Sequence, residues 1–191
     1  MKYIFLIFLA LMFSGCLTTV GTGMNANTIY NVYSVSQDER GIYSIIRDKV
    51  IKTKIQTKIA STKNLSNFDI DVESFWGEVL LIGEVDSAEQ KLELVDIAKS
   101  SGGVRKIKTY IRLKSDRECG SSDELAILAQ LKKELFSDSL INGTNIGVSV
   151  VQCDVVFSGV VDKIEQEKRA IWYAMHTKNV REIYSFLIVL E

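Results

Sequence analysis

Apolar side chains recur at four-residue intervals in residues 38–60 and again in residues 123–136, with charged residues between them. This spacing places the apolar groups on one side of a helix, so both segments are predicted as amphipathic helices. Asp123 is expected to cap the second of them. Pairs of apolar, β-branched runs follow the helices and predict two β-hairpins, 69–73 with 79–85 and 145–151 with 155–161.

The hairpin turns are predicted at Trp76-Gly77 and at Gln152-Cys153-Asp154. A further helix is expected after each hairpin, with Ser87 as the cap of the first, and a third strand closes each half. Each half of the chain is therefore an αββαβ unit of the α+β class, with a three-stranded mixed sheet and two helices on one face. The predicted helices are 87–100 and 163–178, and the closing strands are 106–113 and 181–190.

The two halves are copies of one unit, because residues 76 positions apart match without a gap. Gly83-Glu84-Val85-Asp86 lies over Gly159-Val160-Val161-Asp162, and the offset is 159 − 83 = 76. The match continues downstream, for example from Val104-Arg105 to Val180-Arg181. Duplication of this kind predicts two tandem domains. Their expected bounds are 38–114 for the first module, 115–122 for a linker and 123–191 for the second module.

The first residues have the pattern of an export signal. Residues 3–13 form an apolar run as long as a signal-peptide core and shorter than the about 20 residues that span a bilayer. The run ends in Ser14-Gly15-Cys16, which resembles a bacterial lipobox, although Phe13 stands where Leu is usual. The resemblance implies a signal peptide over 1–15, acylation of Cys16 by groups such as palmitate, and a tether over 16–37. The alternative is an ordinary secretory signal in which Cys16 is incidental.

Composition narrows the possible partners. The 191 residues carry a formal net charge of −1, which argues against nucleic acid, since binding to phosphates needs clustered Lys and Arg. His176 is the only histidine. Without a second histidine or a cysteine pair at metal spacing, no metal site, cofactor or catalytic triad is expected. Asp86 and Asp162 recur before helices, and capping explains both better than paired catalytic carboxylates.

The repeated unit resembles the BON module, named for an osmotically induced bacterial protein and a nodulation protein. The resemblance rests on the turn Trp76-Gly77, the strand ending Leu81-Ile82-Gly83, Ala98 in the second helix and Gly103-Val104 before the last strand. The second copy has Asn179 at the position of Gly103, and Asn can also adopt the left-handed conformation.

An acylated cysteine followed by two such modules is similar to the dual-BON outer-membrane lipoproteins of Gram-negative envelopes. That family implies anchoring on the periplasmic face of the outer membrane, binding of anionic phospholipid, support of outer-membrane integrity and no enzymatic activity. Leu17 after the cysteine, where Asp would retain the protein at the inner membrane, agrees with that location. The resemblance places the lipid contact on the first helix of the second module. The matching side chains are Leu125, Leu128, Lys132, Lys133 and Phe136.

Other interpretations of this helix remain open. Lys132 and Lys133 are equally explained as a solvated face, and Leu125 and Leu128 equally as residues that pack on the sheet or on the other module. The alternative function is a non-enzymatic scaffold that binds an envelope protein through this surface. In neither case is a small-molecule substrate expected.

Cys119 and Cys153 remain once Cys16 is acylated. In the αββαβ arrangement the hairpin tip returns toward the start of the first helix, so a disulfide between them is predicted. Its loop would stabilise the module by about 3 to 4 kcal/mol in the loop-entropy model. The alternative is two unpaired thiols.

Overall fold

The computed structural model describes residues 41–65 and 70–190. Both modules belong to one compact unit. The predicted signal peptide, Cys16 and the tether lie outside the described residues. No helix within the described ranges is long and apolar enough to cross a bilayer.

The described chain consists of four α-helices and two three-stranded sheets, which confirms the predicted α+β class. In each sheet the middle strand pairs antiparallel with the first strand and parallel with the last, so both sheets are mixed. The first module contains α3 (Ile42–Ser61), β1 (Ile70–Phe75), β2 (Glu78–Val85), α4 (Ala88–Lys99) and β3 (Lys106–Leu113). The second contains α5 (Ser121–Ser137), β4 (Ile146–Val151), β5 (Asp154–Val161), α6 (Ile164–Met175) and β6 (Ile183–Val189). Short 3-10 turns, η2 (Lys114–Asp116) and η3 (Gly143–Asn145), precede α5 and β4.

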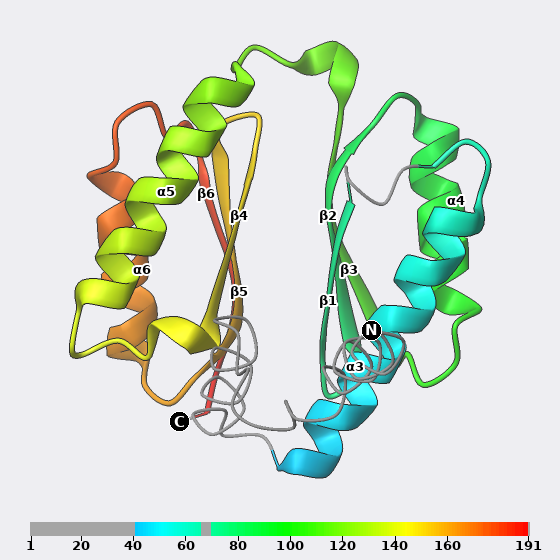
Figure 1. Ribbon diagram of the computed structural model, residues 1–191, viewed down its shortest axis with the longest axis horizontal. Coiled ribbons are helices and arrows are strands. Elements are labelled where there is room, and N and C mark those ends of the chain that lie inside the picture. The colour runs from blue at the N-terminus through cyan, green and yellow to red at the C-terminus, as the bar shows by residue number, and fades with distance from the viewer. Residues whose placement is uncertain (1–40, 66–69, 191) are drawn as a thin grey trace, which may run out of the picture. The chain divides into compact units, whose positions relative to one another are not determined.

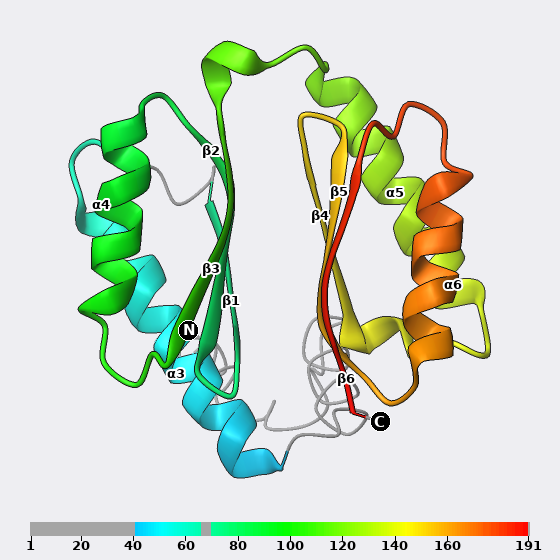
Figure 2. The same cartoon turned by 180° about the vertical axis from the view of Figure 1, so that it is seen from behind.

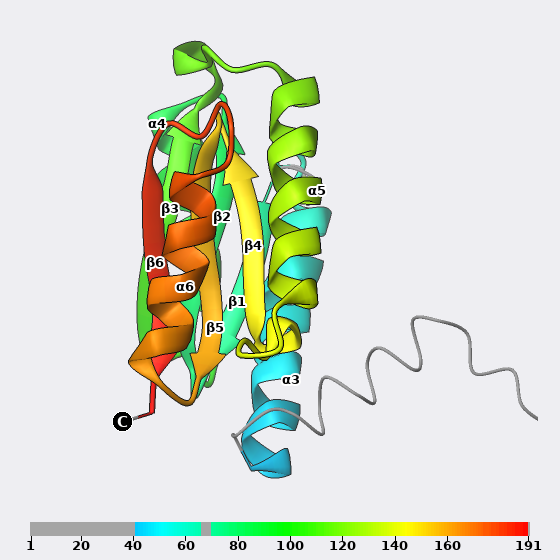
Figure 3. The same cartoon turned by 90° about the vertical axis from the view of Figure 1, so that its left-hand side faces the viewer.

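The two helices of each module cover the same face of its sheet (Figures 1 and 2). Within the modules, α3 packs along β1 and α5 packs along β4, as Figure 3 shows for α5. In each module, one side of the first helix, α3 or α5, therefore points away from the sheet.

The predicted caps were partly wrong. Ser87 does cap α4, since its Oγ accepts a hydrogen bond from the backbone N–H of Gln90. Asp123 does not cap α5, because that helix begins at Ser121, two residues earlier, and Asp123 lies within its first turn. The carboxylates of Asp86 and Asp162 do not cap either. Their backbone N–H groups instead donate to Gln90 and Gln166 in the first turns of the following helices.

Both hairpins turn through two residues with positive φ, the geometry of a type I′ turn. Trp76 and Gly77 have φ values of 52° and 80°, and Gln152 and Cys153 have values of 52° and 62°. Asp154, predicted to belong to the second turn, is already the first residue of β5. Cys153 therefore occupies the glycine position of the turn. The prediction for Asn179 is confirmed, because its φ of 67° matches the left-handed conformation of Gly103.

A carboxylate on the first helix of each module binds the hairpin turn. Asp48 is almost fully buried and accepts hydrogen bonds from the N–H groups of Trp76, at 2.7 Å, and Gly77, at 2.8 Å. In the second copy, 76 residues later, Oε1 of Glu124 accepts from the N–H of Gln152 at 2.6 Å. The duplicated units thus keep the same helix-to-turn contact with different acidic side chains.

The middle strands are buried on both faces. In β2, alternate residues such as Val79 and Leu81 join the core beneath α3 and α4, whereas Leu80 and Ile82 point to the opposite face. That opposite face packs against the second module, and Val156 of β5 belongs to the same cluster. The complete cluster between the modules contains Leu80, Ile82, Tyr110, Val151 and Val156, with Tyr184 and Phe186 packed against it.

Candidate membrane-contact face and module junction

Helix α5 presents an exposed apolar and basic face. Leu125 is 67% exposed and Phe136 is 53% exposed, and both Lys132 and Lys133 are exposed. Residues 125, 132 and 136 are separated by seven and four positions, a spacing that aligns them along one side of a helix. Leu128 is half-buried at the edge of this face. Four of the five predicted side chains are therefore exposed, and three of them are aligned.

The opposite side of α5 forms the core of the second module. Ile127, Leu131 and Leu135 are buried there against the sheet and α6. Ile127, Leu131 and Leu135 therefore pack on the sheet, whereas Leu125 does not. Lys132 and Lys133 form no ion pair with any residue in the described ranges. We refer to Leu125, Lys132, Lys133 and Phe136 below as the α5 face.

The first module has no equivalent of this face. The residues that stand 76 positions earlier are Lys49, Gln56, Thr57 and Ala60, which are polar or small. Since the two modules share one fold, packing alone does not explain why only α5 exposes Leu and Phe here. This difference between the two modules is already visible in the sequence, because the offset of 76 pairs each residue of the α5 face with its counterpart in α3.

Leu140, which was not predicted, extends the apolar surface just after α5 and is 65% exposed. Its position is set by Asp138, whose Oδ1 accepts a hydrogen bond from the backbone N–H of Leu140 at 2.9 Å. Oδ2 of Asp138 accepts from Nε of Arg169 at 2.7 Å and from the hydroxyl of Tyr173 at 2.9 Å. Burial acts to raise the pKa of Asp138, but these bonds and the charge of Arg169 outweigh it and hold the pKa below its ordinary value.

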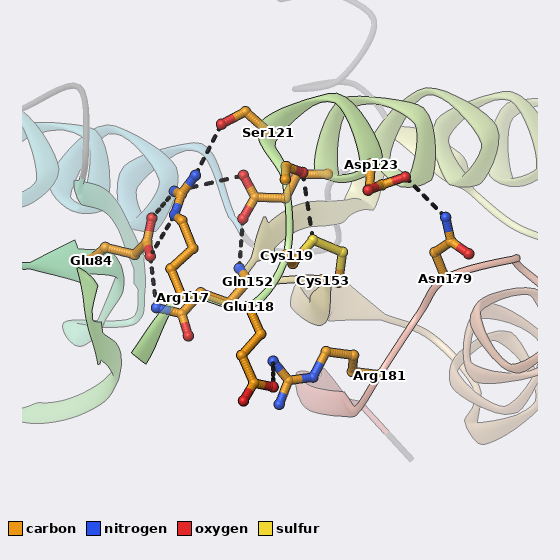
Figure 4. Close-up of a disulfide and its surroundings, with 12 residues drawn as sticks. Glu84, Arg117, Glu118, Cys119, Ser121, Asp123, Gln152, Cys153, Asn179 and Arg181 are labelled. Atoms are coloured by element: carbon orange, nitrogen blue, oxygen red, sulfur yellow. Dashed lines mark hydrogen bonds and ion pairs between the residues drawn. A yellow bond between two sulfur atoms is a disulfide. The ribbon is translucent and has the colours of Figure 1, made fainter. Parts of the chain in front are cut away.

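The predicted disulfide between Cys119 and Cys153 is present, with the two Cα atoms 5.8 Å apart (Figure 4). It joins the linker before α5 to the turn between β4 and β5. Next to it, Nδ2 of Asn179 donates to Asp123 at 2.9 Å, and Arg181 pairs with Glu118 at 3.4 Å. These contacts hold the start of α5 against the hairpin and the strand end of the second module.

A buried polar group connects the modules. Gln152 is fully buried in the hairpin turn of the second module, and its Nε2 donates to Oε1 of Glu84 and to the carbonyl of Leu113, each at 2.7 Å. Arg117 also binds Glu84, with Nε to Oε1 at 3.2 Å (Figure 4). Burial acts to raise the pKa of Glu84, but the bonds from Arg117 and Gln152 and the charges of Arg117 and Lys114 hold the pKa below its ordinary value.

Tyr110 and Asp154 form a second polar contact between the modules. The hydroxyl of Tyr110 donates to Oδ2 of Asp154 at 2.6 Å, and its ring lies 4.5 Å from the ring of Tyr184, centroid to centroid. Burial and the adjacent carboxylate raise the pKa of Tyr110 well above its ordinary value. Tyr110 therefore stays protonated and remains a hydrogen-bond donor at neutral pH.

Trp172 and His176, near the end of α6, form a ring contact that lies apart from the contacts between the modules. Trp172 is exposed, and its ring stacks at 4.1 Å on the ring of His176, which is exposed as well. Nδ1 of His176 lies 2.7 Å from the carbonyl of Trp172. Tyr173, the residue between them in this part of α6, packs against the core of the second module. Within residues 41–65 and 70–190, no three His, Cys, Asp or Glu side chains gather in a way that could hold a metal ion.

Comparison with known families finds the BON domain twice, over residues 47–115 and 123–191. Osmotically-inducible protein Y of Escherichia coli (strain K12) is 26% identical over 139 residues, covering 71% of this chain and 69% of that protein. A protein from the gshII 5′ region of Anaplasma centrale is 22% identical over 89 residues, covering 47% of this chain and 59% of that protein. Among solved structures, CdsD, a structural protein of the type III secretion system of Chlamydia trachomatis, matches with a TM-score of 0.31 and 14% identity. That match covers 74% of this chain and 63% of the other.

Proposed function

Because the chain belongs to the BON family, whose domain model matches more than half of it, we propose that it is a lipid-anchored envelope protein that binds anionic phospholipid through its second module. In this proposal the chain is acylated at Cys16 after removal of the signal peptide. It is held on the periplasmic face of the outer membrane and supports the integrity of that membrane. It acts by binding alone, without a cofactor or a small-molecule substrate.

The observation that carries this proposal is the α5 face. It exposes two large apolar side chains beside two lysines in one module, and the other module has polar or small residues at the same positions. Helices that lie at a membrane surface combine an apolar side with Lys or Arg near the head groups. The disulfide and Asp138 hold the two ends of this helix in place, so the face is formed before any lipid binds.

The expected affinity of the α5 face by itself is low. Each lysine near an anionic surface contributes about 1 kcal/mol. Asp123, Glu124 and Glu134 on the same helix reduce its net charge. An acyl anchor at Cys16 compensates, because it keeps the module near the membrane at a high effective concentration. Weak contacts are then sufficient to orient the protein on the surface.

The test uses the chain from residue 16 onward with Cys16→Ser, so that no acyl group obscures the contact. NMR chemical shifts are followed during titration with anionic micelles and then with zwitterionic micelles. We expect shifts that cluster on residues 123–141 and appear only with the anionic lipid. The double variant Leu125→Ser, Phe136→Ser is expected to lose them.

Leu92→Ser provides the matched control, since Leu92 lies on α4 and is 66% exposed, like Leu125. It should leave the lipid-dependent shifts unchanged. Shifts that ignore lipid charge, or that survive the double variant, would contradict the proposal. Shifts produced only by an envelope protein would instead support the scaffold function. Mass spectrometry of the protein isolated from membranes tests acylation at Cys16 separately.

A further inference from the structure

The first turns of α3 expose an apolar surface that the second module lacks. Tyr43 is 79% exposed, Ile42 68%, Ile46 57% and Val50 47%. Residues 42, 46 and 50 follow one another at four-residue spacing, so they form a continuous stripe along the helix. The buried side of α3 is formed by other residues, among them Ile45, Ile51 and Ile55. The stripe is therefore not needed for the fold of the first module.

Comparison of the copies shows that this stripe lies partly outside the repeated unit. The first residue of α5, Ser121, corresponds to residue 45, so α3 begins three residues earlier than its counterpart. Ile42, Ile46 and Val50 correspond to Glu118, Ser122 and Ala126. Exposed isoleucines lower the solubility of a protein, so we expect a partner surface to cover Ile42 and Ile46.

The charges on α3 indicate the chemistry of that surface. The helix carries five basic residues, Arg47, Lys49, Lys52, Lys54 and Lys58, and one acidic residue, Asp48. The carboxylate of Asp48 is buried beneath the hairpin turn, so every exposed charge on the helix is positive. By contrast, α5 has three acidic residues and two basic ones. Lys49 and Lys54 are exposed beside the stripe and form no ion pair with any described residue.

We propose that Ile42, Tyr43, Ile46 and Val50, with Lys49 and Lys54, form a second membrane-contact surface that lies on anionic head groups of the membrane holding the acyl anchor. This surface, the α3 face, is separate from the α5 face, and its assignment rests on the proposed anchor at Cys16. An aromatic ring such as that of Tyr43 is favourable at the head-group boundary. The lysines attract anionic lipid while their aliphatic stems pack beside the apolar stripe.

The position of α3 along the chain supports a membrane as the occupant. It is the first described helix after Cys16, and 25 residues separate Cys16 from Ile42. A chain of that length reaches at most about 90 Å, so an anchored protein keeps this face within that distance of the bilayer. The cores of protein interfaces are depleted in lysine, whereas helices at membrane surfaces are rich in it. The flanking lysines therefore favour lipid over a protein partner or a second copy of this chain.

The experiment uses the complete acylated protein reconstituted into vesicles. Ile46→Cys adds a free thiol that is labelled with an environment-sensitive fluorophore, while Cys119 and Cys153 remain joined in the disulfide. Leu92→Cys on α4 provides a control of similar exposure. Vesicles contain phosphatidylcholine alone or mixed with phosphatidylglycerol, with a quencher on the acyl chains. We expect a blue shift and strong quenching at position 46 with phosphatidylglycerol and neither effect at position 92. Lys49→Glu combined with Lys54→Glu should remove the quenching at position 46.

Failure of this inference and failure of the proposed function give different results. A label at position 125, from Leu125→Cys, reports on the α5 face. Quenching at position 125 without quenching at position 46 would overturn the α3 assignment and leave the α5 assignment standing. The reverse result would overturn only the α5 assignment. A blue shift at position 46 without lipid would show that protein covers the stripe, and an unacylated Cys16 would overturn both proposals.

Discussion

Gln152 in the hairpin turn of the second module donates a hydrogen bond of 2.7 Å to the carboxylate of Glu84 in β2 of the first. This bond crosses from one copy of the repeated unit to the other. Both side chains are buried, and Arg117 from the linker binds the same carboxylate. The linker, the turn and the strand therefore meet at one charged group, and the first two predictions concern it.

Replacing Gln152 with Ala should destabilise the protein by about 1 to 3 kcal/mol, because it leaves Glu84 and the carbonyl of Leu113 with fewer hydrogen bonds in a buried place. Urea unfolding of the complete protein measures the change. Gln130→Ala is the control, since Gln130 is exposed on α5, and its effect should lie within about 0.5 kcal/mol. Equal effects of the two variants would show that the junction contributes no stability.

Glu84 should make stability dependent on acidic pH. The pKa of Glu84 in the folded protein lies below its ordinary value of 4.5, so its contribution is fully present above that pH and is lost as the pH falls through the folded-state pKa. Unfolding free energies measured from neutral to acidic pH should therefore decrease below about pH 4.5. Glu84→Gln should flatten this decrease. Asp138 contributes in the same direction, so some dependence should remain in that variant.

Loss of the disulfide should destabilise the second module. The bond closes a segment with a sequence separation of 34, for which the loop-entropy model gives about 3 to 4 kcal/mol. The double variant Cys119→Ser, Cys153→Ser measures this loss by chemical denaturation. A second double variant, Cys119→Ser with Cys153→Gly, should be more stable than the first by about 1 kcal/mol, because glycine adopts the positive φ of this turn without strain. An advantage of serine over glycine would contradict the type I′ geometry.

Gly159→Ala should destabilise the protein by more than about 3 kcal/mol. A Cβ atom there would collide with the backbone carbonyl of Asn145, and the φ of 134° is one that side chains rarely adopt. Gly41→Ala is the control, because a Cβ at Gly41 meets no atom within 4 Å. Thermal unfolding of both variants checks the difference. A small effect at position 159 would mean that the strand shifts easily at this point.

Much of the fold could be predicted from local signals. The turn residues and the apolar periods predicted both hairpins, and the tolerance of asparagine for positive φ predicted the conformation of Asn179. The disulfide followed from topology, since the tip of a hairpin must return toward the preceding helix. Each of these features depends on residues near one another in the sequence or on the order of elements.

The features that were missed depend on distant partners. An apolar run such as β2 is compatible with burial on one face or two, and only the second module explains why Leu80 and Ile82 are buried. Asp48 and Glu124 look like ordinary surface residues of amphipathic helices until the turn is placed above them. The α5 face was predicted by resemblance, whereas the exposed stripe on α3 is recognised only when the core of that helix is known.

The packing of the modules has the character of a symmetric dimer within one chain. Leu80 and Val156, 76 residues apart, occupy equivalent positions in the two copies and lie in the same cluster, and Tyr110 and Phe186 repeat this relationship. At these two pairs of positions each module offers its partner the same part of its surface, as subunits do around a two-fold axis. A chain with one such module would be expected to pair with itself through this surface. Gene duplication would convert that pair into a folding unit whose stability no longer depends on protein concentration.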